Sequence, residues 1–198
     1  MRMADLFCGA GGISDGAAAE GWEVIGVDIV RRPEYKHPLI HKDILTIEAN
    51  EIGPVDWLHA SPPCQRFSTA RASRVVDPPT EADLVLLQAA LRLRDQLKPR
   101  FWSIENVAGA VPLFSKVLGP PALNNGAFRF WGNFPPFLMP TSQPHRKGRQ
   151  EKSKTGKQSL AWKGKHRSPW LRAYVPATIS RPLAVACRTP FGNLEADR

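Results

Sequence analysis

A cysteine in a rigid corner is the first residue of this chain whose position suggests chemistry. Residues 61–65 read Ser-Pro-Pro-Cys-Gln and follow an apolar run at 55–60. Two consecutive prolines can neither extend a strand's hydrogen-bond ladder nor begin a helix at once, so Cys64 is expected on a stiff loop at the carboxyl end of a strand. Ligands bind at that edge of open α/β sheets. A thiolate there would be a nucleophile, although cysteine more often packs as a small buried hydrophobe.

A carboxyl group is expected in the same row. Residues 101–107, Phe-Trp-Ser-Ile-Glu-Asn-Val, form another apolar run with Glu105 and Asn106 near its end. A glutamate at a strand terminus is usually just solvated. Parallel strands with right-handed crossovers would bring it to the edge that carries Cys64. A nucleophile beside an acid would suit covalent catalysis with proton transfer.

A glycine-rich turn supplies the third motif. Residues 5–14 read Asp-Leu-Phe-Cys-Gly-Ala-Gly-Gly-Ile-Ser, which predicts a short strand, a tight turn and then a helix of small residues over 14–20. Glycines let the backbone approach a ligand, and the amides at a helix amino terminus face it. A second strand over 22–28 ends in Asp28, where such folds hold ribose hydroxyls. The pattern predicts a nucleotide-type cofactor, without the Gly-x-Gly-x-x-Gly spacing specific for a pyrophosphate.

The three motifs, in this order, resemble the cofactor, nucleophile and glutamate motifs of the cytosine-C5 DNA methyltransferases. The likeness covers roughly residues 3–110, and residues 175–186 resemble more weakly the family's last motif, a helix that returns to the cofactor domain. Family members usually begin the nucleophile motif with Gly-Pro-Pro-Cys, so Ser61 is a departure. The resemblance implies S-adenosyl-L-methionine as cofactor and a covalent bond from Cys64 to C6 of a flipped-out cytosine.

The resemblance also implies roles for the residues that match the motifs. Glu105 would stabilise the attacked base, with Asn106 orienting either Glu105 or the base. Asp43 lies where relatives place an acid on the adenine amino group, although an ordinary loop acid is the alternative. The predicted cofactor-binding residues are Asp5, Phe7, Cys8, Gly9, Ala10, Gly11, Gly12, Asp28, Ile29, Asp43, Ile44 and Pro62. No metal is expected, because three cysteines at positions 8, 64 and 187 form neither a ligand cluster nor a disulfide framework.

The whole positive charge excess of the chain lies in one segment. The formal net charge is +9, and residues 145–172 hold ten Lys or Arg against one acid, interleaved with tryptophans. Such a segment fits a phosphate-backbone partner, whereas a solubilising or anionic-surface tail is the alternative. Residues 66–80, small, polar and basic, are expected to form a catalytic lid. The predicted nucleic-acid contacts are Gln65, Ser68, Arg71, Arg74, Lys152, Lys154, Lys157, Trp162, Lys163, Lys165 and Arg167.

Two departures from the family pattern limit target recognition. The family's Gln-x-Arg-x-Arg segment is missing, and either Arg129 or residues 144–149 would take its place. Only about 40 residues, from 136 to 174, remain for target recognition, and they are rich in Lys, Arg, Ser and Gly. Such a loop offers few rigid side chains that could read bases. The recognised DNA sequence is therefore expected to be short or relaxed, or its choice to be supplied by an accessory subunit.

The predicted fold is an α/β, Rossmann-like methyltransferase domain with a mostly parallel sheet and a small basic insertion. Strands are expected to end near residues 7, 28, 60 and 105, and a helix is expected between Thr80 and Lys98. Three parts are expected: a cofactor-binding and catalytic domain over 1–135, a basic insertion over 136–174, and a returning helix over 175–198. No apolar stretch approaches the length of a membrane span, which favours the cytoplasm.

The predicted activity is methylation of DNA cytosine at C5. Two alternatives stay open at this stage. The first is an RNA cytosine-C5 methyltransferase, because tRNA-modifying relatives share these motifs and a basic loop does not distinguish the two sugars. The second is a catalytically degenerate nucleic-acid-binding or regulatory subunit, which the missing arginine motif favours and the intact Cys64 and Glu105 oppose.

Overall fold

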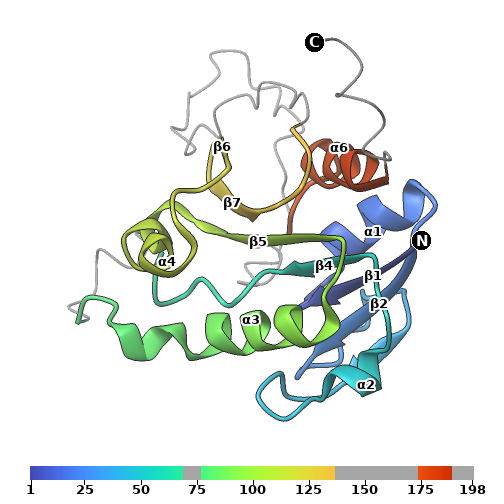
Figure 1. The fold of residues 1–198 in the computed structure, drawn as a ribbon, viewed down its shortest axis with the longest axis horizontal. Helices are drawn as coiled ribbons and strands as arrows, with labels where there is room; N and C mark the ends of the chain where they lie inside the picture. Colours follow the sequence, from blue (N-terminus) through green and yellow to red (C-terminus); the bar gives the residue numbers. More distant parts are fainter. Residues whose placement is uncertain (69–76, 137–173, 189–198) are drawn as a thin grey trace, which may run out of the picture.

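The structure is a computed structural model, and it describes residues 1–68, 77–136 and 174–188. In these residues a seven-stranded sheet has the order β3-β2-β1-β4-β5-β7-β6 (Figure 1). The five strands from β3 to β5 are parallel, and β7 and β6 add an antiparallel edge. The predicted α/β fold with a mostly parallel sheet is therefore confirmed.

Strands and helices alternate along most of the described chain. The strands are β1 (Arg2–Leu6), β2 (Glu23–Asp28), β3 (Leu39–His41), β4 (Trp57–Ala60), β5 (Phe101–Val107), β6 (Leu123–Asn125) and β7 (Phe128–Gly132). The helices are α1 (Gly12–Ala19), α2 (Ala49–Ile52), α3 (Val85–Leu97), α4 (Val111–Leu118) and α6 (Ala177–Arg188). The four predicted strands end within two residues of the expected positions, whereas β3, β6 and β7 were not predicted.

Each face of the sheet carries its own core, because successive side chains of a strand point to opposite faces. Trp57 and Phe101 are paired in register and belong to the core shared with α1 and α6. Leu58 and Ile104 point the other way, into the core shared with α3 and α4. Both faces of the central strands are thus buried, as expected for a parallel sheet.

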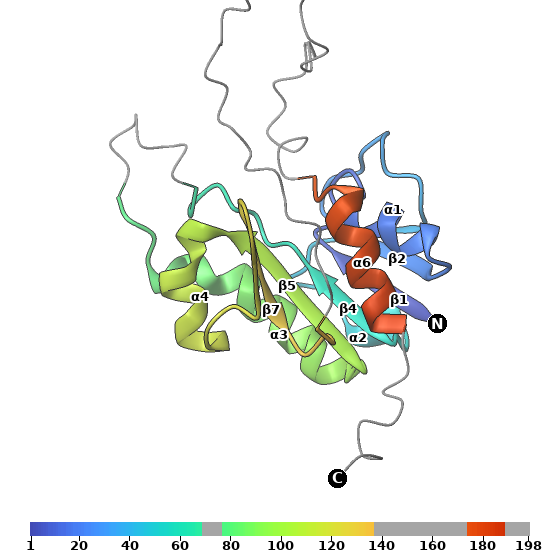
Figure 2. The ribbon, with the colours of Figure 1, turned by 90° about the horizontal axis from the view of Figure 1, so that it is seen from above.

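Helix α6 returns from the end of the chain to lie beside α1, as Figures 1 and 2 both show. Two glycines of α1 make the approach possible: a Cβ at Gly12 would lie 2.6 Å from the Val175 carbonyl oxygen, and one at Gly16 would lie 2.1 Å from the Ser180 hydroxyl oxygen. The Trp22 indole donates to the Ala184 carbonyl at 3.1 Å. The last described helix therefore supports the helix that follows the glycine turn.

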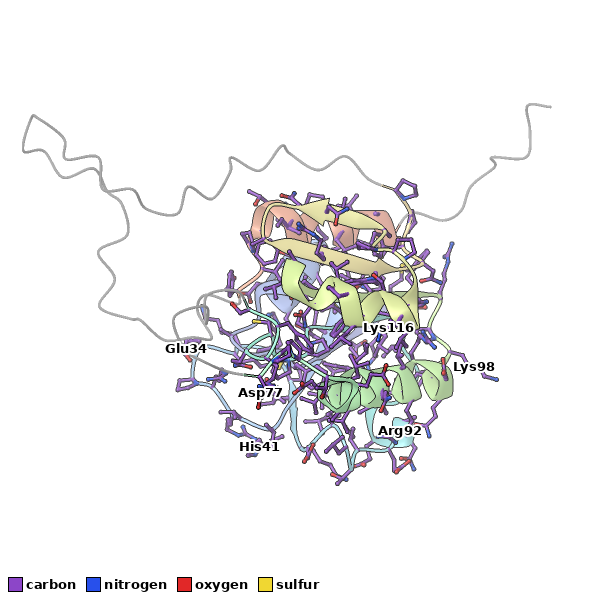
Figure 3. The ribbon with its side chains drawn as sticks, turned by 90° about the vertical axis from the view of Figure 1, so that its left-hand side faces the viewer. Glu34, His41, Asp77, Arg92, Lys98 and Lys116 are labelled. Carbon is purple, nitrogen blue, oxygen red and sulfur yellow. The ribbon has the colours of Figure 1, made fainter. Side chains whose placement is uncertain are left out.

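The predicted helix after residue 80 begins and ends as its sequence indicates. Thr80 and Asp83 form a capping box around a 3-10 turn (Glu81–Leu84), which continues as α3. Lys98 ends the helix in the left-handed conformation, with φ of 47°. In Figure 3 the residues Glu34 and Asp77, which follow β2 and β4, lie on the opposite side of the view from Lys98, which precedes β5. The loops at the carboxyl ends of the parallel strands thus gather on one side.

A search of the described segments finds no helix long and apolar enough to cross a membrane.

Candidate active site

The glycine turn after β1 bends back over the end of β2. Phe7 has a φ of 60°, a conformation that non-glycine residues rarely adopt, and its amide donates to the Val27 carbonyl at 2.8 Å. Gly9 has a φ of 54°, and its amide donates to a carboxylate oxygen of Asp28 at 2.9 Å. The backbone therefore folds tightly around the Asp28 side chain, and α1 begins at Gly12 immediately after the turn.

The residues after β2 offer the chemistry that a nucleoside needs. The second carboxylate oxygen of Asp28 accepts from the Val30 amide at 2.8 Å. Ile29 and Val30 are 62% and 45% exposed although both are apolar. A carboxylate beside an uncovered apolar surface fits a ribose with its attached base, since one binds hydroxyls and the other the flat ring. The site is thus compatible with the nucleoside half of S-adenosylmethionine.

Asp5 and Cys8, two of the predicted cofactor-binding residues, have buried side chains. The Ser14 hydroxyl donates to the Asp5 carboxyl at 2.6 Å and also contacts the Tyr35 hydroxyl at 3.1 Å. Burial raises the pKa of Asp5 to about 7, although its bonds with Ser14 oppose the rise. Burial also raises the pKa of the Cys8 thiol, with the charges of Asp5 and Asp28 adding to the effect. The Asp5 side chain thus ties β1 to α1 on the buried side of the turn.

The predicted adenine-binding pair lies just after β3. One carboxylate oxygen of Asp43 accepts from the Leu45 amide at 2.9 Å and starts the next turn. Ile44 is buried in the core, so its backbone rather than its side chain is available to a ligand. Arg92 of α3 donates to the carbonyl oxygens of Ile44 and Ile47 at 3.1 and 2.9 Å and fixes this loop from below.

Strand β5 holds the loop that carries Cys64. The side-chain amide of Asn106 donates to the Pro62 carbonyl at 2.9 Å, and the Ser61 amide donates to the Leu6 carbonyl at 3.1 Å. A Cβ at Gly109 would lie 1.9 Å from the Phe67 carbonyl oxygen, so the loop lies directly against the chain that follows β5. The half-buried Cys64 is thereby fixed on both sides.

The charge of Glu105 acts on the Cys64 thiol. Burial raises the pKa of the Cys64 thiol, and the negative charge of Glu105 raises it further. Glu105 is 8% exposed, and burial raises its pKa to about 7 while a hydrogen bond from Ser61 opposes the rise. The structure thus brings the predicted nucleophile and acid together at the carboxyl edge of the sheet.

Two polar side chains behind Glu105, those of His59 and Ser103, were not singled out by the sequence. His59 is fully buried, with Nδ1 lying 2.8 Å from the Ser103 hydroxyl oxygen and Nε2 lying 2.9 Å from the Ser61 hydroxyl oxygen. The signal was present as alternation: Trp-x-His-x-Ser at 57–61 and Phe-x-Ser-x-Glu at 101–105 each place polar side chains on one face of an otherwise apolar strand.

Arg129 is not brought to Cys64 or Glu105 by any contact of the described residues. Its guanidinium donates to the carbonyl oxygens of Gly126 and Phe128 at 2.8 and 2.9 Å, within its own hairpin. Arg129 is paired with Asn106, whereas Glu105 is paired with Phe130, so Arg129 starts from the face opposite Glu105. The alternative arginines, at residues 144–149, lie outside the described residues.

Few of the predicted nucleic-acid contacts can be placed. Gln65 is exposed beside Cys64, and Ser68 is half-buried. Arg66 is held by Asp83 in a two-pronged ion pair with distances of 2.7 and 3.1 Å, which anchors the start of the predicted lid to the 3-10 turn before α3. The remaining predicted contacts lie outside the described residues, namely Arg71, Arg74, Lys152, Lys154, Lys157, Trp162, Lys163, Lys165 and Arg167.

A family model of the C-5 cytosine-specific DNA methylases matches residues 1–115, the part that contains all three motifs. The chain belongs to this family. The predicted resemblance is therefore confirmed at the level of the family.

Curated members of the family match the same part of the chain. The Type II methyltransferase M.FnuDI of Fusobacterium nucleatum is 31% identical over 116 residues, 55% of this chain and 33% of that protein. The Type II methyltransferase M.NgoPII of Neisseria gonorrhoeae is 30% identical over 118 residues, 55% of this chain and 34% of that protein. The chain thus spans about a third of the length of the curated relatives it matches.

A solved structure supports the fold. A protein provisionally described as a DNA modification methyltransferase, encoded within a prophage of E. coli, superposes with a TM-score of 0.50 at 23% identity. The superposition covers 67% of this chain and 45% of that one. At this identity the likeness shows the methyltransferase-type α/β fold and nothing finer.

Proposed function

We propose that this chain transfers a methyl group from S-adenosylmethionine to C5 of cytosine in DNA, through a covalent bond between Cys64 and C6 of the base. The observation that carries the proposal is the hydrogen bond from Asn106 to Pro62, which ties the end of the strand that carries Glu105 to the loop that carries Cys64, on the edge where the glycine turn and Asp28 also lie. Family membership supports the same reaction.

Cytosine needs such a pair because its C5 is a weak nucleophile. Addition of the Cys64 thiolate to C6 forms an S–C bond and pushes electrons toward N3, where a proton from Glu105 stabilises the developing charge. C5 would then take the methyl group, with the demethylated cofactor as the leaving group. Transfer of the C5 proton to water and elimination of Cys64 would restore the ring. The base must be flipped out of a duplex or be unpaired before Cys64 reaches it.

The protonation state of Glu105 links the two groups. A carboxyl group whose pKa is about 7 keeps its proton in a large fraction of molecules near neutral pH. The protonated form can donate to N3, and it also removes the negative charge that raises the pKa of Cys64. One proton on Glu105 therefore favours both the thiolate and the activated base.

S-adenosylmethionine would supply an electrophilic methyl group. Asp28 would hold the ribose hydroxyls, Ile29 would lie on the adenine ring, and Asp43 would accept from the adenine amino group. The glycine turn from Phe7 to Gly12 would lie against the methionine part, with Pro62 between cofactor and base. The polar and apolar character of these positions supports the assignment.

Binding to DNA is assigned to the basic residues after the catalytic core. The net charge of +9 within residues 145–172 favours contacts with phosphates, which would hold all DNA sequences alike. Gln65, Ser68 and the lid would approach the flipped base. An accessory subunit remains part of the proposal for target choice, because residues 136–174 are few.

Transfer of a radiolabelled methyl group to cytosine-containing duplex DNA, with tRNA as a parallel substrate, tests the proposal. Label in 5-methylcytosine of the DNA, lost in Cys64→Ser, is the expected result. Cys8→Ala is the matched control, because a second cysteine near the cofactor turn should leave turnover measurable. Labelling of tRNA alone would favour the RNA enzyme, and labelling of neither would favour a degenerate nucleic-acid-binding protein.

A further inference from the structure

We propose that Ser103, His59 and Ser61 form a directional hydrogen-bond relay that positions Glu105, with each donor pointing toward the Glu105 carboxyl group. The function of Glu105 as an acid rests on the proposed function above, but the direction of the relay does not. The three side chains are positioning residues, because none of them is expected to touch the substrate.

The register of β4 and β5 builds the relay. Trp57 is paired with Phe101 and His59 with Ser103, so alternate positions of both strands face the same side of the sheet. The Trp57 indole donates to the Ser103 hydroxyl oxygen at 2.9 Å, and that hydroxyl lies 2.8 Å from His59 Nδ1. His59 Nε2 lies 2.9 Å from the Ser61 hydroxyl. Ser61 and Glu105 each follow the His59–Ser103 pair by two residues, so their side chains leave the sheet on the same face, and Ser61 opposes the rise that burial causes in the pKa of Glu105.

The direction follows from counting donors. An indole nitrogen can only donate, so Ser103 accepts from Trp57 and keeps its own proton to give away. If His59 carried its proton on Nδ1, that proton would also be donated to Ser103, whose hydroxyl proton would then have no acceptor among the described residues. Because Ser103 is 1% exposed, that arrangement would bury an unsatisfied donor. Ser103 therefore donates to Nδ1, and Nε2 carries the imidazole proton.

The same direction continues to Glu105. A neutral His59 with its proton on Nε2 donates to the Ser61 oxygen, so the Ser61 hydroxyl donates to Glu105. Burial lowers the pKa of His59 to about 3, which keeps the ring neutral at any pH of interest. In this arrangement one oxygen of Glu105 accepts from Ser61, which leaves the other oxygen to carry the acid proton.

Other groups near the relay do not disturb this arrangement. Asp5 is the register partner of His59 on β1, but its carboxyl group is bonded to the Ser14 hydroxyl. Phe130, the register partner of Glu105 on β7, carries no charge. Within residues 1–68, 77–136 and 174–188, the titratable group coupled to Glu105 is the Cys64 thiol. The Gly-Pro-Pro-Cys form of the motif lacks the Ser61 hydroxyl and could not complete the relay.

The tautomer of His59 is the first test, and it needs neither a variant nor a substrate. Long-range ¹H–¹⁵N correlation spectra of the wild-type chain between pH 6 and 8 should show a neutral imidazole protonated on Nε2. An imidazole protonated on Nδ1, or one that titrates in this range, would overturn the relay.

The second test follows the Glu105 carboxyl carbon by ¹³C NMR during a pH titration. Ser61→Ala removes the donor, so the pKa of Glu105 should rise by about one further unit, because a hydrogen bond to a charged group is lost. Ser61→Thr keeps a hydroxyl and should restore the wild-type value. An unchanged pKa in Ser61→Ala would overturn the relay.

Enzyme kinetics then separates this proposal from the proposed function. If Glu105 is the acid, Ser61→Ala should move the alkaline limb of the kcat profile upward by about the same unit and lower kcat about ten-fold, with KM for S-adenosylmethionine unchanged. A wild-type chain without methyl transfer would refute the proposed function, while the two NMR measurements would still decide the relay.

Discussion

The side-chain amide of Asn106 donates to the carbonyl oxygen of Pro62 at 2.9 Å, across 44 residues of sequence. The strand that carries Glu105 thereby holds the loop that carries Cys64. Both partners are buried, and the Asn106 side-chain oxygen also accepts from the Val107 amide at 2.9 Å. The placement of the nucleophile relative to the acid therefore depends on this asparagine as well as on the loop itself.

Replacing this asparagine should separate catalysis from cofactor binding. Asn106→Leu has a similar volume but no donor, so the Pro62 carbonyl loses its partner and the corner loosens, at a cost of about 1–3 kcal/mol in unfolding free energy. Methyl transfer should fall at least ten-fold, while calorimetry should show wild-type affinity for S-adenosylmethionine. Equal losses of cofactor affinity and turnover would instead indicate a general defect in folding.

Asp28 should decide cofactor affinity. Asp28→Ala removes the carboxylate that accepts from Gly9 and Val30 and that would hold the ribose, so the dissociation constant for S-adenosylmethionine should rise at least ten-fold. Glu23→Gln is the matched control, because it removes a carboxylate from the other end of the same strand. Similar affinities for all three proteins by calorimetry would refute the cofactor assignment.

The close contact between α1 and α6 should contribute to the unfolding free energy of the chain. Gly16→Ala places a methyl group where the Ser180 hydroxyl now lies, so the unfolding free energy should fall by roughly 1–3 kcal/mol. Urea denaturation followed by circular dichroism measures the change. The double variant Gly16→Ala/Ser180→Gly removes the side chain that the new methyl group would meet, so it should recover part of the lost unfolding free energy. No loss in the single variant would mean that the helices do not approach this closely.

Buried Asp5 should make stability depend on pH in an unusual direction. Its pKa is raised to about 7 in the folded protein from 3.8 when unfolded, so the folded state favours the protonated form. Its stabilising contribution is therefore full below about pH 4 and is lost as the pH rises toward 7, at up to about 1.4 kcal/mol per pH unit.

Asp5→Asn keeps an oxygen that accepts from Ser14 but cannot ionise. The difference in unfolding free energy between this variant and the wild type should therefore grow in favour of the variant from pH 4 to pH 7, by a few kcal/mol in total. Urea denaturation of both proteins across this range measures the difference. Parallel curves would show that Asp5 titrates in the folded state as it does in the unfolded one.

The parts of the fold that local sequence determines could be predicted. Prolines, glycines and a capping threonine mark the ends of β4, the turn after β1 and the start of α3 within a few residues. The strands β3 and β6 have three residues each, too few for a periodic pattern, and β7 pairs antiparallel with β5 through contacts distant in sequence. Their existence depends on packing that the local pattern does not encode.

Some residues of the candidate site could likewise be predicted from the local sequence, and others could not. Cys64, Glu105 and Asp28 stand out because their residue types are unusual at strand ends. Asn106 was assigned to Glu105 or the base, and its observed partner, Pro62, depends on how two strands align. His59 and Ser103 were missed because a buried histidine in an apolar run usually means packing, and their contact spans 44 residues.

Covalent capture of the base tests the central claim most directly. A duplex oligonucleotide with 5-fluorocytosine blocks loss of the C5 substituent, so the S–C6 bond formed by the nucleophile should persist. With S-adenosylmethionine present, mass spectrometry of the wild-type chain should show an adduct carrying the DNA at the peptide that contains Cys64, and Cys64→Ser should form none. An adduct at Cys8 or Cys187, or full methyl transfer by Cys64→Ser, would contradict the account.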